Sequence, residues 1–193
     1  VSQLFICSNG YIQLGSATAS SLSPQTLPSP LTPNNIIALA WQDLKVDPAL
    51  NAGSSVRYFV NGTSPNRVFV IAFNNLCFTT NTGDVTGQIR LYEADSHIEV
   101  AAVSVNDNGS NFVKTLGIEN GAGTLATTPT GRNRAVWNLA APETWGFYPP
   151  VGGTYGYAWT PSTYLSNPAI ANPMANAMMT TTTYTATATN TVT

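Results

Sequence analysis

Charged side chains are scarce in this chain: Asp, Glu, Lys and Arg make up 8% of its 193 residues, against about a quarter in a typical soluble domain. The seven basic residues are scattered, and the formal net charge is −2. Because nucleic-acid binding needs a basic stripe or patch, this pattern argues against a nucleic-acid partner. Thr, Asn, Ser, Ala and Gly take the place of the charges, as in many extracellular β-proteins.

Long apolar runs are also missing, although 43% of the residues are hydrophobic. No run approaches the roughly 20 residues that span a bilayer as a helix, so the sequence predicts no membrane span. The chain begins VSQLFICSNGYIQLG, which is typical of a strand and a turn and has no charged leader region. We therefore expect a mature or excised fragment of a larger protein.

Catalytic side chains are few. His97 is the single histidine, and Ser–His–Asp or Cys–His catalysis would need a nucleophile and an orienting group beside it. Its place just after a turn predicts a solvent-facing strand residue instead. The acidic residues stand in no recognisable motif of paired catalytic carboxylates, and one histidine with two distant cysteines does not make a zinc site. The sequence therefore predicts a protein that is not an enzyme.

The two cysteines, Cys7 and Cys77, both lie in strand-like stretches. One interpretation is a disulfide, which would stabilise the fold by closing a long loop. The other is a pair of separate buried thiols that act as small hydrophobic side chains. Sequence alone leaves both interpretations open, because it does not show whether the two Cα atoms approach.

What the chain does have is a hydrophobic period of two residues, the signature of β-strands. FICSNGYIQL reads as two strands around Asn9-Gly10, a strong hairpin signal. Residues 16–35 hold four prolines among Ser and Thr and predict a long surface loop. Further strands are expected in IIALAWQDL, SVRYFVNG, NRVFVIAFNNLCF, GQIRLYEADSHIEVAAVSV (turning at residues 93–96) and FVKTLGIEN. The fold class predicted for residues 1–150 is an all-β, antiparallel β-sandwich.

A second, smaller module is predicted over residues 151–193, after the boundary at Pro149-Pro150. Its end, TTTTYTATATNTVT over residues 180–193, contains nine threonines in fourteen residues and alternates cleanly, which predicts a strand. Forty-three residues are too few for an Ig-like sandwich of about 100 residues. We therefore expect an incomplete Ig-like module whose strand 180–193 pairs with a neighbouring domain of the same protein or with another subunit.

The motifs CSNGYIQLG, NNIIALAWQDL, SVRYFVNGTSPNRVFVIAFNN and GQIRLYEADSHIEV occur in order. This series resembles a β-sandwich module of large secreted surface proteins of Bacteroidota, loosely similar to the extracellular nidogen-type domain. YAWTPSTYLSNPAIANPMANAMMTTTTYTATATN resembles the C-terminal half of the Ig-like, PKD-like repeats of the same proteins. The resemblance implies export by the type IX secretion system and a place among cell-surface adhesins.

The sequence offers two kinds of candidate ligand site. WQDLKVD and NDNGSN place Asp43, Asp47 and Asp107 in loops that could hold calcium, although Asp and Asn also form turns through their own backbone. Among the four tryptophans, Trp41 and Trp159 are predicted to be core residues. Trp137 and Trp145 are predicted either to stack on sugars or to fill the domain junction.

These observations predict a non-catalytic, extracellular structural or adhesive segment of a larger cell-surface or secreted protein. Two alternatives remain at this stage. One is a carbohydrate-binding module of a secreted hydrolase, with surface glycans as partners and a calcium-bound loop. The other is a self-assembling filament or sheath subunit that donates its C-terminal strand.

Overall fold

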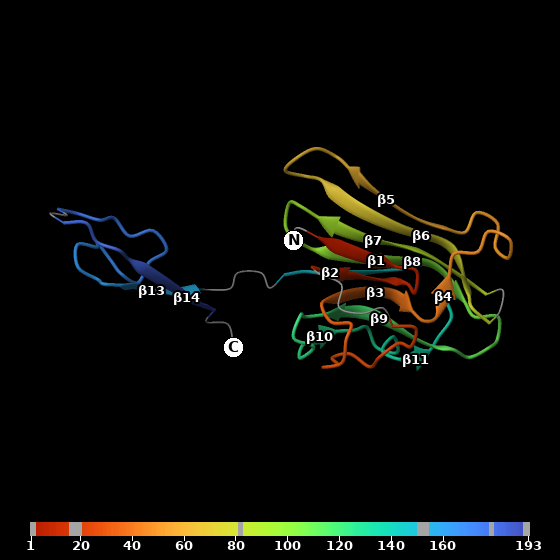
Figure 1. Cartoon of the computed structure of the whole chain (residues 1–193). Coiled ribbons are helices and arrows are strands. Elements are labelled where there is room, and N and C mark those ends of the chain that lie inside the picture. Colours follow the sequence, from red (N-terminus) through yellow and green to blue (C-terminus); the bar gives the residue numbers. More distant parts are fainter. Residues whose placement is uncertain (1–2, 16–20, 81–82, 150–154, 178–179, 191–193) are drawn as a thin grey trace. The chain divides into compact units, whose positions relative to one another are not determined.

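The computed structural model describes residues 3–15, 21–80, 83–149, 155–177 and 180–190. The chain divides into two compact units, Val1–Pro149 and Pro150–Thr193 (Figure 1). The junction Pro150-Val151, where the sequence predicted a module boundary, lies outside the described residues.

The first unit is built from twelve strands in its described part, and the second from two. Their bounds are β1 Leu4–Cys7, β2 Tyr11–Leu14, β3 Ile36–Trp41, β4 Leu44–Lys45, β5 Ser55–Asn61, β6 Val68–Phe78, β7 Asp84–Tyr92, β8 Ile98–Asn106, β9 Val113–Glu119, β10 Ala126–Thr127, β11 Ala135–Val136, β12 Glu143–Phe147, β13 Tyr155–Thr160 and β14 Thr185–Asn190.

Two antiparallel sheets form the first unit (Figure 1). The first sheet has the order β1-β2-β3-β9-β10, with β11 also paired to β9. The second has the order β12-β8-β7-β6-β4, with β5 also paired to β6. No helix occurs in the described residues, so none of them could form a helix that crosses a membrane. The predicted all-β fold is confirmed.

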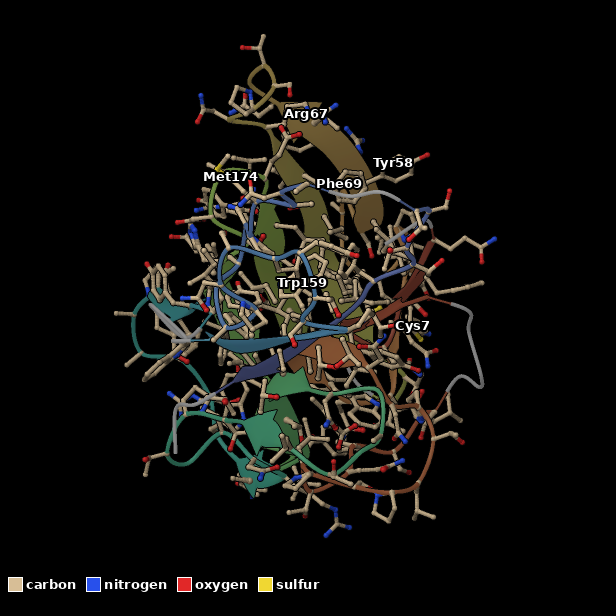
Figure 2. The ribbon with its side chains drawn as sticks, turned by 90° about the vertical axis from the view of Figure 1, so that its left-hand side faces the viewer. Cys7, Tyr58, Arg67, Phe69, Trp159 and Met174 are labelled. Atoms are coloured by element: carbon tan, nitrogen blue, oxygen red, sulfur yellow. The ribbon has the colours of Figure 1, made fainter. Side chains whose placement is uncertain are left out.

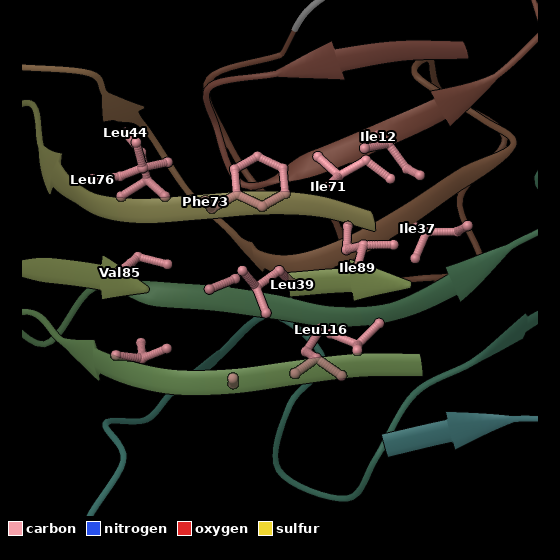
Figure 3. Close-up of a cluster of buried hydrophobic side chains, with 14 of the residues drawn as sticks. Ile12, Ile37, Leu39, Leu44, Ile71, Phe73, Leu76, Val85, Ile89 and Leu116 are labelled. Atoms are coloured by element: carbon pink, nitrogen blue, oxygen red, sulfur yellow. The ribbon is translucent and has the colours of Figure 1, made fainter. Parts of the chain in front are cut away.

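The core lies between the two sheets (Figure 3). Leu39 of β3 and Leu116 of β9 face Ile71 and Phe73 of β6 and Ile89 of β7, and all five are at most 1% exposed. The alternation of inward apolar and outward polar side chains, visible in the sequence as a period of two, produces this interior.

Glycine is required at two places in this sandwich. Gly10 closes the β1–β2 hairpin with φ of +79°, a conformation that residues with a Cβ rarely adopt. Gly87 of β7 lies where the sheets approach closely. A Cβ built there would stand 2.5 Å from the carbonyl oxygen of Ala101 and 2.8 Å from a methyl carbon of Leu39.

The outer face of the first sheet is covered by residues 21–35, which form no strand. Leu27 packs there in a second buried cluster with Tyr11 and Trp41. Hydrogen bonds to its backbone at Gln25, Leu27 and Ser29 are among those that fasten this segment to the sheet and to the loop beside it. The long surface loop that the sequence predicted is present in its described part, residues 21–35. The sequence did not show that this loop also covers apolar side chains of the sheet.

The second unit contains one hairpin-like pair, in which β13 runs antiparallel to β14 with Trp159 opposite Ala186. Of the strand predicted over residues 180–193, residues 185–190 form β14, Thr185–Asn190. Residues 180–184 form no strand, and residues 191–193 lie outside the described residues. Trp159 donates its indole N–H to the carbonyl of Ile170 at 3.0 Å. None of the described residues of this unit is buried.

Candidate binding surfaces and a buried polar cluster

An apolar surface follows β5, an edge strand that pairs only with β6 in the described residues. Tyr58 and Val60 are 67% and 55% exposed and lie on the same side of the sheet as Phe69, which stacks on Tyr58 with ring centroids 5.8 Å apart. We call Tyr58, Val60 and Phe69 the β5 edge surface. Figure 2 shows Tyr58 and Phe69 close together near Arg67. Large exposed apolar side chains that gather in this way mark interaction sites in soluble proteins.

Two grooves meet at this surface, and Phe69 lines both. One, of about 460 Å³, is bounded by β1 residues 4–6 and by Tyr58. The other, of about 550 Å³, is bounded by Val60 and by Arg67 and Glu93. The arrangement therefore offers apolar contact area beside a fixed pair of charges.

Arg67 and Glu93 form a two-pronged ion pair at the wall of the larger groove, with Arg67 Nε 2.8 Å from Glu93 Oε2 and Nη2 bonded to Oε1. Hydrogen bonds from Arg67 lower the pKa of Glu93 to about 2. The fork geometry fixes both side chains, so the groove keeps its charge arrangement over the physiological pH range.

His97 does not face solvent, which corrects the prediction from sequence. Its side chain is 12% exposed. The ring is stacked between Tyr92, at 3.8 Å between centroids, and Tyr148, at 4.9 Å. Nδ1 contacts the carboxylate of Asp95. The histidine joins the β7–β8 turn to the residue after β12, a packing role.

The two tryptophans proposed as sugar platforms differ in the structure. Trp137 is 6% exposed, donates its indole N–H to the carbonyl of Lys114 at 3.1 Å, and carries the Arg132 guanidinium over its ring at 4.6 Å. It is a core residue and not an exposed platform. Trp145 on the edge strand β12 is 36% exposed, and stacking of a ligand on its ring stays a prediction. Trp41 is fully buried, as the sequence predicted, whereas Trp159 is only partly buried, so its prediction as a core residue was wrong.

The three aspartates considered for calcium lie in separate environments. Asp43 accepts a hydrogen bond from the Thr79 hydroxyl at 2.8 Å. Asp47 lies 3.0 Å from Lys45 Nζ and accepts from the Ala49 N–H, and the hydrogen bond from Lys45 lowers its pKa. Asp107 belongs to the buried cluster described next. Within the described ranges, no three His, Cys, Asp or Glu side chains gather in a way that could hold a metal ion.

A buried polar cluster at one end of the core was missed by the sequence analysis. Lys114 of β9 and Asp107, which follows β8, are both fully buried, with Nζ 2.9 Å from Oδ2. Asn138, which follows β11, donates from Nδ2 to Asp107 Oδ1 at 2.9 Å. The sequence predicted that Asp107 lies in a turn. Its partners Lys114 and Asn138 are 7 and 31 positions further along the chain, so only the fold brings the three side chains together.

Cys7 and Cys77 are free thiols in the structure. Cys7 lies in the first sheet and Cys77 in the second, and the Cys77 thiol donates to the carbonyl of Lys45 at 3.6 Å. Of the two interpretations that the sequence left open, the structure therefore corresponds to separate thiols and not to a disulfide.

Together, the fold and these surfaces define a β-sandwich module with an apolar edge. The chain belongs to the nidogen-related domain family, whose model matches residues 1–161, that is, the whole first unit and β13 of the second. Domains of this family are non-catalytic and typically extracellular. Comparisons with curated proteins and with solved structures gave no match.

Proposed function

We propose that this chain is a non-catalytic structural and adhesive segment of a larger cell-surface or secreted protein, and that it adheres through the β5 edge surface. The observation that carries the proposal is the exposure of Tyr58 and Val60 beside two grooves, on a strand edge that no other described strand pairs with. Such an edge offers free backbone N–H and C=O groups together with apolar area. The family membership supports an extracellular site of action.

The parent protein we propose is a modular surface protein of Bacteroidota exported by the type IX system. Support comes from the motif series CSNGYIQLG to GQIRLYEADSHIEV and from the T-T-T-Y-T-x-T-x-T strand, which resemble modules of those proteins. The nidogen-related match is consistent with the first of these two resemblances.

The adhesive role can be tested with beads that carry the chain, applied to glycan-coated surfaces and to bare polymer surfaces under shear. Replacing Tyr58 and Val60 with serine should remove most of the adhesion. The matched control replaces two exposed apolar residues elsewhere, Leu125 and Val136, and should retain it. Equal retention by both double variants would show that the β5 edge surface is not adhesive. Binding that is confined to glycans and lost with Trp145→Ala would instead indicate a carbohydrate-binding module.

A second candidate function, assembly through the C-terminal strand, is favoured by the second unit. Strand β14 pairs only with β13 among the described residues, and none of the described residues of this unit is buried. An isolated two-stranded ribbon is marginally stable in water, so a partner that supplies further strands would stabilise it.

Deleting residues 180–193 should then convert an assembled form into a monomer while leaving the first unit folded. Size-exclusion chromatography with light scattering gives the mass of each form. Circular dichroism of the shortened chain should keep the β-sheet signal and the melting transition of the first unit. An unchanged oligomeric state and unchanged stability after the deletion would rule out assembly through this strand.

A further inference from the structure

The buried polar cluster brings an amine next to a carboxamide. Lys114 Nζ lies 3.5 Å from Asn138 Oδ1, 2.9 Å from Asp107 Oδ2 and 2.9 Å from the carbonyl oxygen of Phe112. Asn138 Nδ2 donates to Asp107 Oδ1 at 2.9 Å. The single carboxylate of Asp107 thus contacts the amine through one oxygen and the carboxamide nitrogen through the other.

The surroundings of the amine are apolar. Nζ lies 5.6 Å from the ring centre of Phe78 and 5.8 Å from that of Trp137. The side chains of Lys114 and Asp107 have no exposed area, whereas Asn138 reaches the surface. The reacting amine is therefore shielded from water, while Asn138 lies at the boundary between the cluster and the surface.

Burial lowers the pKa of Lys114 below its usual value, and the contacts with Asp107 only partly offset this. Burial alone would raise the pKa of Asp107, but hydrogen bonds from Asn138 and Lys114, together with the Lys114 charge, outweigh it and lower the pKa to about 2. In the resting cluster Asp107 is therefore the carboxylate, paired with the Lys114 ammonium. Transfer of one proton from Nζ to the carboxylate produces the neutral amine, which is the nucleophilic form of lysine.

We propose that Lys114 and Asn138 form an intramolecular isopeptide bond. Lys114 Nζ attacks the Cγ of Asn138, the Nζ–Cγ bond forms and the Cγ–Nδ2 bond breaks. Overall, one lysine ammonium and one carboxamide become a secondary amide and a released ammonium ion. No oxidant, metal or cofactor takes part in this balance.

Asp107 is the catalytic residue of this step. Its Oδ2 accepts a proton from Nζ, and its Oδ1 faces the leaving Nδ2, to which the proton must go. Its backbone N–H donates to Asn138 Oδ1 at 3.0 Å, so it stabilises the negative charge that develops on this oxygen during the attack. Asp107 returns to the carboxylate form when it passes the proton to the leaving nitrogen, which departs as ammonium toward the surface at Asn138.

The bond would fasten β9 to the segment between β11 and β12. Lys114 already pairs with Ala135 across the β9–β11 ladder, and the bond would replace a set of hydrogen bonds with a covalent closure. A covalent link at the end of a sandwich resists separation of the strands under force, which suits an adhesive segment. The inference itself does not depend on the adhesive function.

The test is the intact mass of the purified full chain under denaturing conditions, followed by tryptic mapping. We expect a mass lower than that of the sequence by one ammonia. Since a linked Lys114 is not cleaved by trypsin, peptide 91–132 should be joined to peptide 135–193. A full sequence mass with cleavage after Lys114 would overturn the proposal and leave an ordinary buried ion pair.

Three variants sharpen the result. Asn138→Ala removes the electrophile and should give the unlinked mass and separate peptides. Asp107→Ala should at least strongly reduce the linked fraction. The control Asn133→Ala removes an asparagine that bonds the backbone of Leu27 and should keep the link.

Two other outcomes would also overturn the assignment. Loss of one water, with a single uncleaved peptide 91–132 that contains both Asp107 and Lys114, would indicate an amide between these two side chains instead. Loss of ammonia without joined peptides would indicate a succinimide at an Asn-Gly turn such as Asn108-Gly109.

Discussion

Truncating Phe73 to alanine is expected to cost about 3–5 kcal/mol of the free energy of unfolding. Phe73 is 1% exposed and lies in the main core cluster between the two sheets (Figure 3). The truncation removes the ring and leaves a cavity that strands on both sides hold open, so the lost burial and the cavity both destabilise the fold. Urea denaturation followed by tryptophan fluorescence measures the change.

The matched control is Phe59→Ala on the neighbouring strand β5. Phe59 is 49% exposed, and a surface truncation usually changes stability by no more than about 0.5 kcal/mol. If the two variants were destabilised equally, the assignment of Phe73 to the inside of the sandwich would be wrong.

Replacing Asp107 with alanine should destabilise the chain by about 3–5 kcal/mol, because it leaves the buried Lys114 ammonium without its carboxylate. The measurement is made in the Asn138→Ala background, where Asn138 cannot supply the electrophile, so that loss of the proposed covalent bond does not contribute. Adding Lys114→Met should recover a large part of the lost stability. A methionine side chain is of similar length, carries no charge that needs a carboxylate, and can pack against Phe78 and Trp137.

Glu93→Ala serves as the comparison for an exposed pair. Glu93 bonds Arg67 at the surface, where solvent screens the charges, so its removal should change stability far less than Asp107→Ala does. A large loss on Glu93→Ala, or no recovery on adding Lys114→Met to Asp107→Ala, would contradict the electrostatic account of the buried pair.

The parts of the fold that depend on neighbours in sequence were predictable. Asn9-Gly10 signals a hairpin because the turn needs a positive φ, and the structure has Gly10 at +79°. Strands β5 to β8 follow the alternation of apolar residues. Trp41, at the end of an apolar run, is fully buried. In each case the residues that form the sequence pattern are also the residues whose local structure the pattern predicts.

The parts that depend on distant neighbours were not predictable. Trp137 was predicted either to stack on sugars or to fill the domain junction, but it is buried against Lys114 and Arg132 of its own unit. His97 follows a turn, yet Tyr148, far along the chain, closes over its ring. The pairing of Asp107 with Lys114 and Asn138 leaves no local pattern, because it arises only when β8, β9 and β11 come to the same end of the sandwich.

The segment over residues 21–35 makes the two outer faces of the first unit different. Because Leu27 of this segment packs against Tyr11 and Trp41 of the first sheet, the segment and not the sheet forms the surface there. The second sheet remains open, with a shallow depression lined in part by Arg57, Gln88 and Val103. A partner that approaches the first unit would therefore meet strand side chains on one side and the strand-free segment on the other.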